Sequence, residues 1–135
     1  MRMSRVTNVA AWGAAVLLAS VMVCHAQSAI EYKTVAEAKA ALLAKPGVES
    51  RLQDGWLVIS ENGGNVTWSF TPEGHEAYPA VAKRMLVQNE DGSFHVLTLL
   101  GCEAAKDPCD RLAQSYQALD EAMKRAIKEE TKPKP

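Results

Sequence analysis

The sequence lacks the residue patterns that mark most hydrolases and metalloproteins. It has three histidines and three cysteines, and one of each falls within the first 26 residues. It contains no His-Glu-x-x-His zinc motif and no Gly-x-Ser-x-Gly motif of a serine hydrolase. We therefore expect no metal ion, no cofactor and no catalytic residue, and an enzyme is the less favoured class.

An excess of charge of either sign is also missing. The first 26 residues contain two arginines and no acidic residue, which leaves 13 basic and 16 acidic side chains for the remaining 109 residues. Nucleic acids and anionic membrane surfaces attract strongly basic proteins. This balance favours neither as a partner.

Only the beginning of the chain has a long apolar run. Arg2 and Arg5 precede an uncharged stretch over 9–23, and Ala26 is the small residue that a signal peptidase needs before its cleavage site. The run is shorter than the about 20 residues of a membrane span. We predict a signal peptide over 1–26, a periplasmic or secreted location, and no membrane span after cleavage.

Two alternatives for this segment remain. A lipoprotein would be anchored at Cys24, although the bulky Val23 does not suit a lipobox, and the segment could also stay as an uncleaved anchor.

The length of the chain after the predicted signal peptide predicts one domain over 27–130, and the Lys-Pro-rich end predicts a flexible tail over 131–135.

Cys102 and Cys109 are the cysteines outside the predicted signal peptide. An even pair in an exported chain predicts a disulfide bond. The alternatives are two free thiols or half of a metal site, but the six intervening residues exceed the roughly two to four of common zinc motifs.

Local patterns predict a helix, four or five antiparallel strands and a second helix. Thr34 and Glu37 form a capping box before a helix over Val35–Ala44, which Pro46-Gly47 ends. The second helix is expected to have Asp107 as N-cap and Pro108 at its first position. Its apolar stripe, spaced by three and four residues, is Cys109, Leu112, Tyr116, Leu119, Met123 and Ile127. The strands are expected over 48–53, 56–61, 65–70, 81–89 and 93–100.

This order predicts an α+β fold in which the long C-terminal helix covers one face of an antiparallel sheet. Alternation places Val66, Trp68 and Phe70 in the core. The segments 56–61 and 93–100 are apolar on both faces, which does not suit strands near the edges of a meander. Either the first helix covers the second face, or the strand order is not a meander, or the protein pairs with another chain.

The loop over 71–80 is the candidate recognition site. It places His75 among acidic side chains, followed by Tyr78, an apolar ring with a polar tip that suits an interface. Lys83 and Arg84 follow, and they point to opposite faces of a strand, so one of them can serve the same surface. A loop histidine that hydrogen-bonds its turn, and a charged strand flank, are the structural alternatives.

The chain resembles a group of small exported proteobacterial proteins of unknown function. The resemblance rests on Trp68-Ser-Phe-Thr-Pro-Glu-Gly-His75, on Ala77-Tyr-Pro-Ala80, on Lys83-Arg84 and on the late cysteine pair. It covers most of the chain after the predicted signal peptide and supports export and the α+β fold. Some such proteins carry a chaperone label, but the His-Pro-Asp tripeptide of J-domains is absent here.

These observations favour a small exported binding or interaction protein without catalysis, inhibitor-like or chaperone-like. Its partner would be another envelope protein or a small anionic ligand, bound through His75, Tyr78, Lys83 and Arg84. The alternatives are a small periplasmic hydrolase that uses His75 as a general base, and an envelope structural protein. A hydrolase needs a second group within hydrogen-bond reach of His75.

Overall fold

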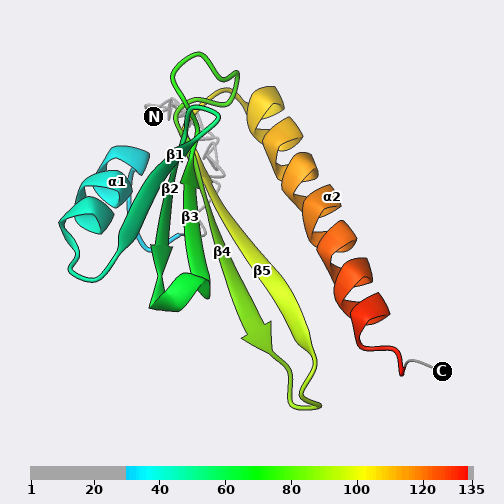
Figure 1. The fold of residues 1–135 in the computed structure, drawn as a ribbon. Helices are drawn as coiled ribbons and strands as arrows, with labels where there is room; N and C mark the ends of the chain where they lie inside the picture. Colours follow the sequence, from blue (N-terminus) through cyan, green and yellow to red (C-terminus); the bar gives the residue numbers. More distant parts are fainter. Residues whose placement is uncertain (1–29, 134–135) are drawn as a thin grey trace, which may run out of the picture.

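The computed structural model describes residues 30–133, so the predicted signal peptide lies outside the described residues. A short helix, five strands and a long helix follow one another along the chain (Figure 1), which confirms the α+β class. The elements are α1 Val35–Ala44, β1 Glu49–Gln53, β2 Trp56–Glu61, the 3-10 turn η1 Asn62–Gly64, β3 Val66–Phe70, β4 Ala80–Gln88, β5 Phe94–Cys102 and α2 Lys106–Glu130. No helix within these residues is long and apolar enough to cross a membrane.

The five strands form one antiparallel meander in the order β1-β2-β3-β4-β5. Asp54 and Gly55 turn β1 into β2 with positive φ angles of 50° and 84°. The strands β4 and β5 have nine residues each, whereas β1 and β3 have five and β2 has six. The end of the β4–β5 hairpin therefore extends beyond the rest of the sheet (Figure 1).

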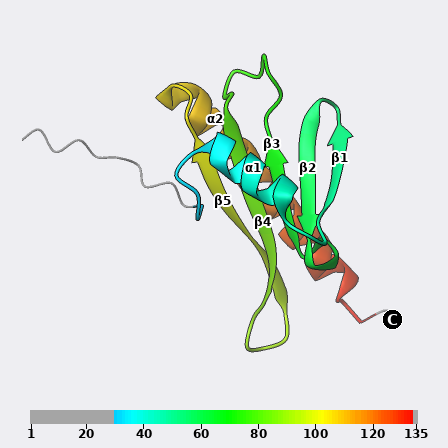
Figure 2. The ribbon, with the colours of Figure 1, turned by 90° about the vertical axis from the view of Figure 1, so that its left-hand side faces the viewer.

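The two helices cover opposite faces of the sheet. Figure 2 shows α1 lying across one face, where Trp68, Phe70 and Ile59 form the main core with apolar residues of α1. On the other face, Leu112 of α2 packs against Ala77 and Ala80 in a smaller cluster. Of the explanations for the strand over 56–61, coverage of its second face by the first helix in a simple meander is correct.

The first helix has the predicted bounds, Val35–Ala44. Thr34 Oγ1 accepts the Glu37 N–H at 3.0 Å, as the capping box predicts. The reciprocal half of the prediction is wrong, because Glu37 Oε2 accepts the Lys33 N–H at 3.2 Å instead of that of Thr34.

The second helix begins earlier than predicted. Its N-cap is Ala105, whose carbonyl accepts the Cys109 N–H at 3.2 Å, so Asp107 and Pro108 lie within the first turn. The first four N–H groups of a helix have no intrahelical partner, and a proline is therefore tolerated at the third position as well as at the first. The Cys102–Cys109 disulfide, with a Cα–Cα distance of 5.9 Å, joins the end of β5 to this turn.

Candidate functional site

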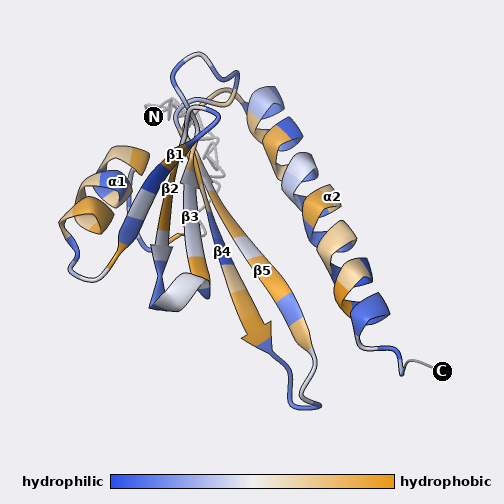
Figure 3. Ribbon diagram, in the orientation of Figure 1, coloured by the Kyte–Doolittle hydropathy of each residue, from blue (hydrophilic) through white to orange (hydrophobic). Residues whose placement is uncertain are grey.

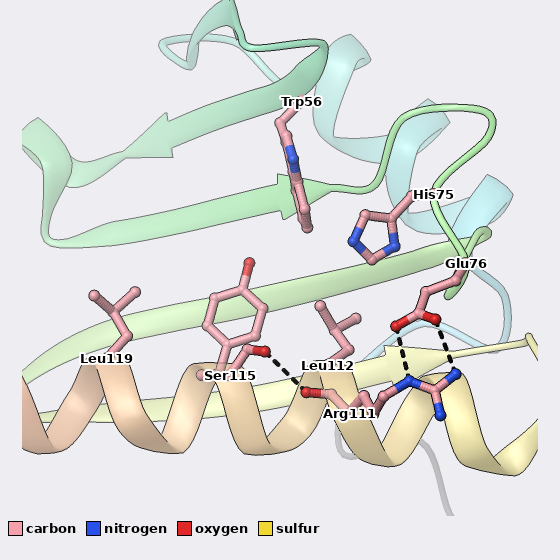
Figure 4. A pocket seen from close by; sticks show the side chains of 8 residues that line it. Trp56, His75, Glu76, Arg111, Leu112, Ser115 and Leu119 are labelled. Carbon is pink, nitrogen blue, oxygen red and sulfur yellow. Dashed lines mark hydrogen bonds and ion pairs between the residues drawn. The ribbon is translucent and has the colours of Figure 1, made fainter.

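A groove lies between α2 and the sheet face beneath it (Figure 4). Its first part has a volume of about 350 Å³ and is lined by Trp56, His75, Glu76, Arg111, Leu112, Ser115, Tyr116 and Leu119. A second hollow of about 240 Å³ shares Trp56 and Tyr116 with the first and continues toward Val58 and Ser69. We call these two hollows together the α2 groove.

The sheet side of the α2 groove carries an aromatic pair. Trp56 is the first residue of β2, and His75 comes from the loop between β3 and β4. Their rings meet edge to face with centroids 5.2 Å apart. The loop holds His75 from both sides, because the His75 N–H donates to the Pro72 carbonyl at 3.1 Å and the Ala77 N–H donates to His75 Nδ1 at 3.1 Å.

This last hydrogen bond determines what the His75 ring can do. Since Nδ1 accepts from the Ala77 N–H, the proton of the neutral ring lies on Nε2. A general base that acts through Nε2 needs the opposite tautomer, with Nδ1–H held by an acceptor. Ser115 lines the same hollow, but its hydroxyl donates to the Arg111 carbonyl at 2.9 Å (Figure 4). The two side chains are thus engaged separately and do not form a nucleophile–base pair.

An ion pair closes one end of the α2 groove. Arg111 of α2 donates to both carboxylate oxygens of Glu76, at 2.9 and 2.8 Å (Figure 4). The hydrogen bond from Arg111 and its positive charge hold the pKa of Glu76 below its ordinary value. The bidentate geometry uses the Nε–Nη2 edge of the guanidinium, which would otherwise be free to bind a carboxylate or phosphate ligand.

The helix side of the α2 groove is apolar with polar edges. Tyr116 is half-buried, and burial raises the pKa of its hydroxyl, while the nearby Ser69 hydroxyl and the charge of Arg84 act in the opposite direction. Leu119, one turn further along α2, leaves 44% of its surface exposed. Apolar surface of Trp56, Tyr116 and Leu119 is therefore accessible to a ligand.

The structure does not bring the four predicted site residues together. His75 lies in the α2 groove, but Tyr78 is at the other side of the loop, in a hollow with Val35 and Lys39 of α1. Lys83 and Arg84 point to opposite faces, as the strand pattern predicts.

Both basic residues of this set are held by acidic partners. Lys83 forms an ion pair with Glu31, and its Nζ lies 4.9 Å from the ring centroid of Trp68. Arg84 Nη2 donates to Asp120 Oδ1 of α2 at 2.8 Å, and Asp120 Oδ2 accepts the Thr98 hydroxyl at 2.6 Å. These contacts give Arg84 a structural position between the sheet and α2.

Trp56, Tyr116 and Leu119 are not part of the recognition site predicted from the sequence. Their spacing predicts core positions, namely a strand face and the apolar stripe of α2. Periodicity alone does not distinguish an apolar residue that lines a groove from one that is fully buried.

Comparisons with known proteins identify no relative. No protein-family model matches the chain, and neither the curated proteins nor the solved structures contain a match. Over residues 30–133, no three His, Cys, Asp or Glu side chains form a group that would hold a metal ion.

Proposed function

We propose that this is an exported protein-binding protein whose α2 groove holds an apolar side chain of an extended segment of another exported protein. The observation that carries the proposal is the exposed apolar surface of Trp56, Tyr116 and Leu119 on facing walls of the groove. Aromatic side chains with a polar tip are frequent anchors in protein interfaces, because they bury a large area and keep a hydrogen-bonding group at the rim.

The groove consists of two connected hollows that can each hold a side chain of a peptide segment. Their volumes are about 350 and 240 Å³, at or below the lower end of the roughly 300–1,000 Å³ of small-molecule pockets. His75 Nε2–H, the Tyr116 hydroxyl and the Ser115 side chain lie at the groove, where they are suited to hydrogen bonds with a peptide backbone.

Charge pairing argues against a small anionic ligand. Arg111, the basic residue that lines the groove, is occupied by Glu76. Arg84 and Lys83, predicted as anion-binding residues, are paired with Asp120 and Glu31. A small anion would have to displace one of these carboxylates, whereas an apolar side chain displaces only water.

The tautomer of His75 argues in the same way against a hydrolase. The catalytic alternative requires His75 Nε2 to accept a proton from a nucleophile, and the Ala77 N–H on Nδ1 opposes that arrangement. Non-catalytic binding uses the ring as it stands, with a donor on Nε2 and an edge-to-face contact with Trp56.

Selection from a library of random extended peptides tests the proposal. We expect the selected peptides to share an aromatic or large aliphatic residue, and Leu119→Asp to weaken their binding at least about 30-fold, as the loss of an interface anchor does. Leu43→Asp is the matched control, since Leu43 on α1 is 49% exposed and Leu119 on α2 is 44% exposed. Selection of acidic peptides, or equal weakening by both substitutions, would contradict the proposal.

A further inference from the structure

The two edges of the sheet differ in their protection against pairing. The edge strand β1 has five residues, all exposed, and includes Glu49 and Arg51. The edge strand β5 has nine residues, without a charged residue or a proline, and Figure 3 shows hydrophobic residues along it. Edge strands that avoid pairing are normally short or charged, or carry proline. β1 fits this description and β5 does not.

The backbone of β5 has hydrogen-bonding groups that point away from β4. Two bonds bracket the β4–β5 ladder: the Asn89 N–H donates to the Ser93 carbonyl at 2.7 Å, and the Glu103 N–H donates to the Pro79 carbonyl at 3.0 Å. Hydrogen-bonded and non-hydrogen-bonded pairs alternate in an antiparallel ladder. The odd-numbered residues of β5 therefore bond to β4, and the even-numbered ones direct their N–H and C=O groups to the open edge. In the part of the chain that the structure describes, no strand pairs with that edge.

The two ends of this edge are complementary. At the start of β5, Phe94 is 43% exposed and lies on the α2 side of the sheet. At the end of β5, a hollow of about 350 Å³ lies beside the edge, between the segment before α1 and the first turns of α2. Its lining includes Leu100, Cys102, Cys109 and Ala113, which give it an apolar side.

We propose that β5 pairs antiparallel with β5 of a second copy of this chain, about a two-fold axis at Thr98. This register places Phe94 opposite Cys102 of the second copy, so that each Phe94 ring enters the hollow of the other copy. It pairs even-numbered residues with even-numbered residues, as the outward hydrogen-bonding groups require. A two-fold interface must be self-complementary, and a side chain at one end with a hollow at the other end meets that condition.

The remaining cross-strand neighbours in this register are compatible. Val96 faces Leu100 of the second copy on the α2 side, and Leu97 faces Leu99 of the second copy on the α1 side. Leu97 is 42% exposed in the single chain, and the pairing covers it. No charged residue opposes another, because β5 contains none. The pairing also explains why a strand at the edge of the sheet is apolar on both faces.

Sedimentation velocity over a range of concentrations tests the second copy as partner. We expect the full chain, with its disulfide intact, to form dimers, and Leu97→Lys to raise the dimer dissociation constant by about 100-fold or more, because two charges then face the apolar leucines across the interface. Leu52→Lys, at the exposed leucine of β1, is the matched control and leaves the dimer unchanged. If the wild-type protein stays monomeric at every concentration, the proposal is wrong. A strand of a different protein would then be the candidate to pair with β5.

Cysteine cross-linking tests the register independently of affinity. Thr98→Cys places two thiols opposite each other, at the roughly 5.5 Å Cα–Cα distance of a hydrogen-bonded pair, which a disulfide can span. Val96→Cys places them four residues apart along the paired strands, about 13 Å, which is too far. A covalent dimer of the Thr98→Cys protein alone supports the register, and a covalent dimer of the Val96→Cys protein alone overturns it.

Discussion

The carboxylate of Glu61 offers a sharp test of how the α1 side of the core is stabilised. Its side chain is 10% exposed, and Oε2 accepts the indole N–H of Trp68 at 2.6 Å. Trp68 itself is 1% exposed. Lys45 forms an ion pair with the other carboxylate oxygen, but the Lys45 side chain is 54% exposed. The bond to Trp68 is thus the buried part of this arrangement.

Replacing Glu61 by alanine should destabilise the protein by about 2 kcal/mol. A hydrogen bond to a charged group contributes roughly 1.5–3 kcal/mol, and the indole N–H would be left buried without a partner. The exposed Lys45 end adds little, because solvent and salt screen it. For a domain of about 100 residues, 2 kcal/mol corresponds to a Tm lower by roughly 8–16 °C.

The effect of Glu61→Ala should depend on pH. Burial by itself raises the pKa of Glu61, but the hydrogen bonds from Lys45 and Trp68 outweigh it and hold the pKa below the ordinary value of 4.5. As the pH falls, the unfolded chain therefore takes up this proton before the folded one. The contribution of Glu61 is present above about pH 4.5 and is lost as the pH falls through the folded-state pKa.

Thermal unfolding followed by circular dichroism, at neutral pH and below pH 4, measures both quantities. We expect a large Tm difference between the wild type and Glu61→Ala at neutral pH, and a smaller one in acid. Lys45→Ala serves as the control and should cost little. If Glu61→Ala melts like the wild type at neutral pH, or if Lys45→Ala lowers the Tm as much as Glu61→Ala, then the buried bond to Trp68 does not stabilise this side of the core.

Three further substitutions test other parts of the structure. Cys109→Ser should lower the free energy of unfolding by about 2–3 kcal/mol, as expected for a short loop closed by a disulfide, and reductant should bring the wild type to the same urea midpoint. Asp120→Ala should cost about 2–3 kcal/mol because it leaves the largely buried guanidinium of Arg84 unpaired, and a double variant with Arg84→Met should recover part of that loss in urea unfolding. Tyr78→Ala should change the free energy of unfolding by less than about 1 kcal/mol, since Tyr78 is 45% exposed. A titration with a selected peptide should show unchanged binding for Tyr78→Ala and weakened binding for Leu119→Asp.

The elements could be predicted where the signals are local. Thr34 and Pro46 fix the ends of α1 through a side-chain cap and a missing N–H, which act on their nearest neighbours. The alternation of Val66, Trp68 and Phe70 likewise predicts their face of β3, because strand geometry has a period of two. The start of α2 was predicted two residues too late, because an Asp-Pro pair fits either of two positions in the first turn of a helix.

Of the residues that line the α2 groove, only His75 was predicted as a site residue. Its position in the loop over 71–80 is a local property, but the neighbours that make a groove around it come from β2 and α2. The sequence pattern does not indicate that Tyr78 lies toward α1 while His75 lies toward α2. Lys83 and Arg84 were separated by strand geometry as expected, and their acidic partners, Glu31 and Asp120, are 52 and 36 residues away in sequence.

The two tryptophans of the described region allow the most direct test of the α2 groove. Trp56 lines the groove, whereas Trp68 is buried under α1 with its N–H bonded to Glu61. Their indole N–H signals can be assigned in ¹H–¹⁵N NMR spectra with Trp56→Phe and Trp68→Phe, and then followed during titration with a selected peptide. We expect the Trp56 signal to shift with saturation while the Trp68 signal stays in place. A shift of the Trp68 signal without one of Trp56, or no shift of either in the bound protein, would contradict this expectation.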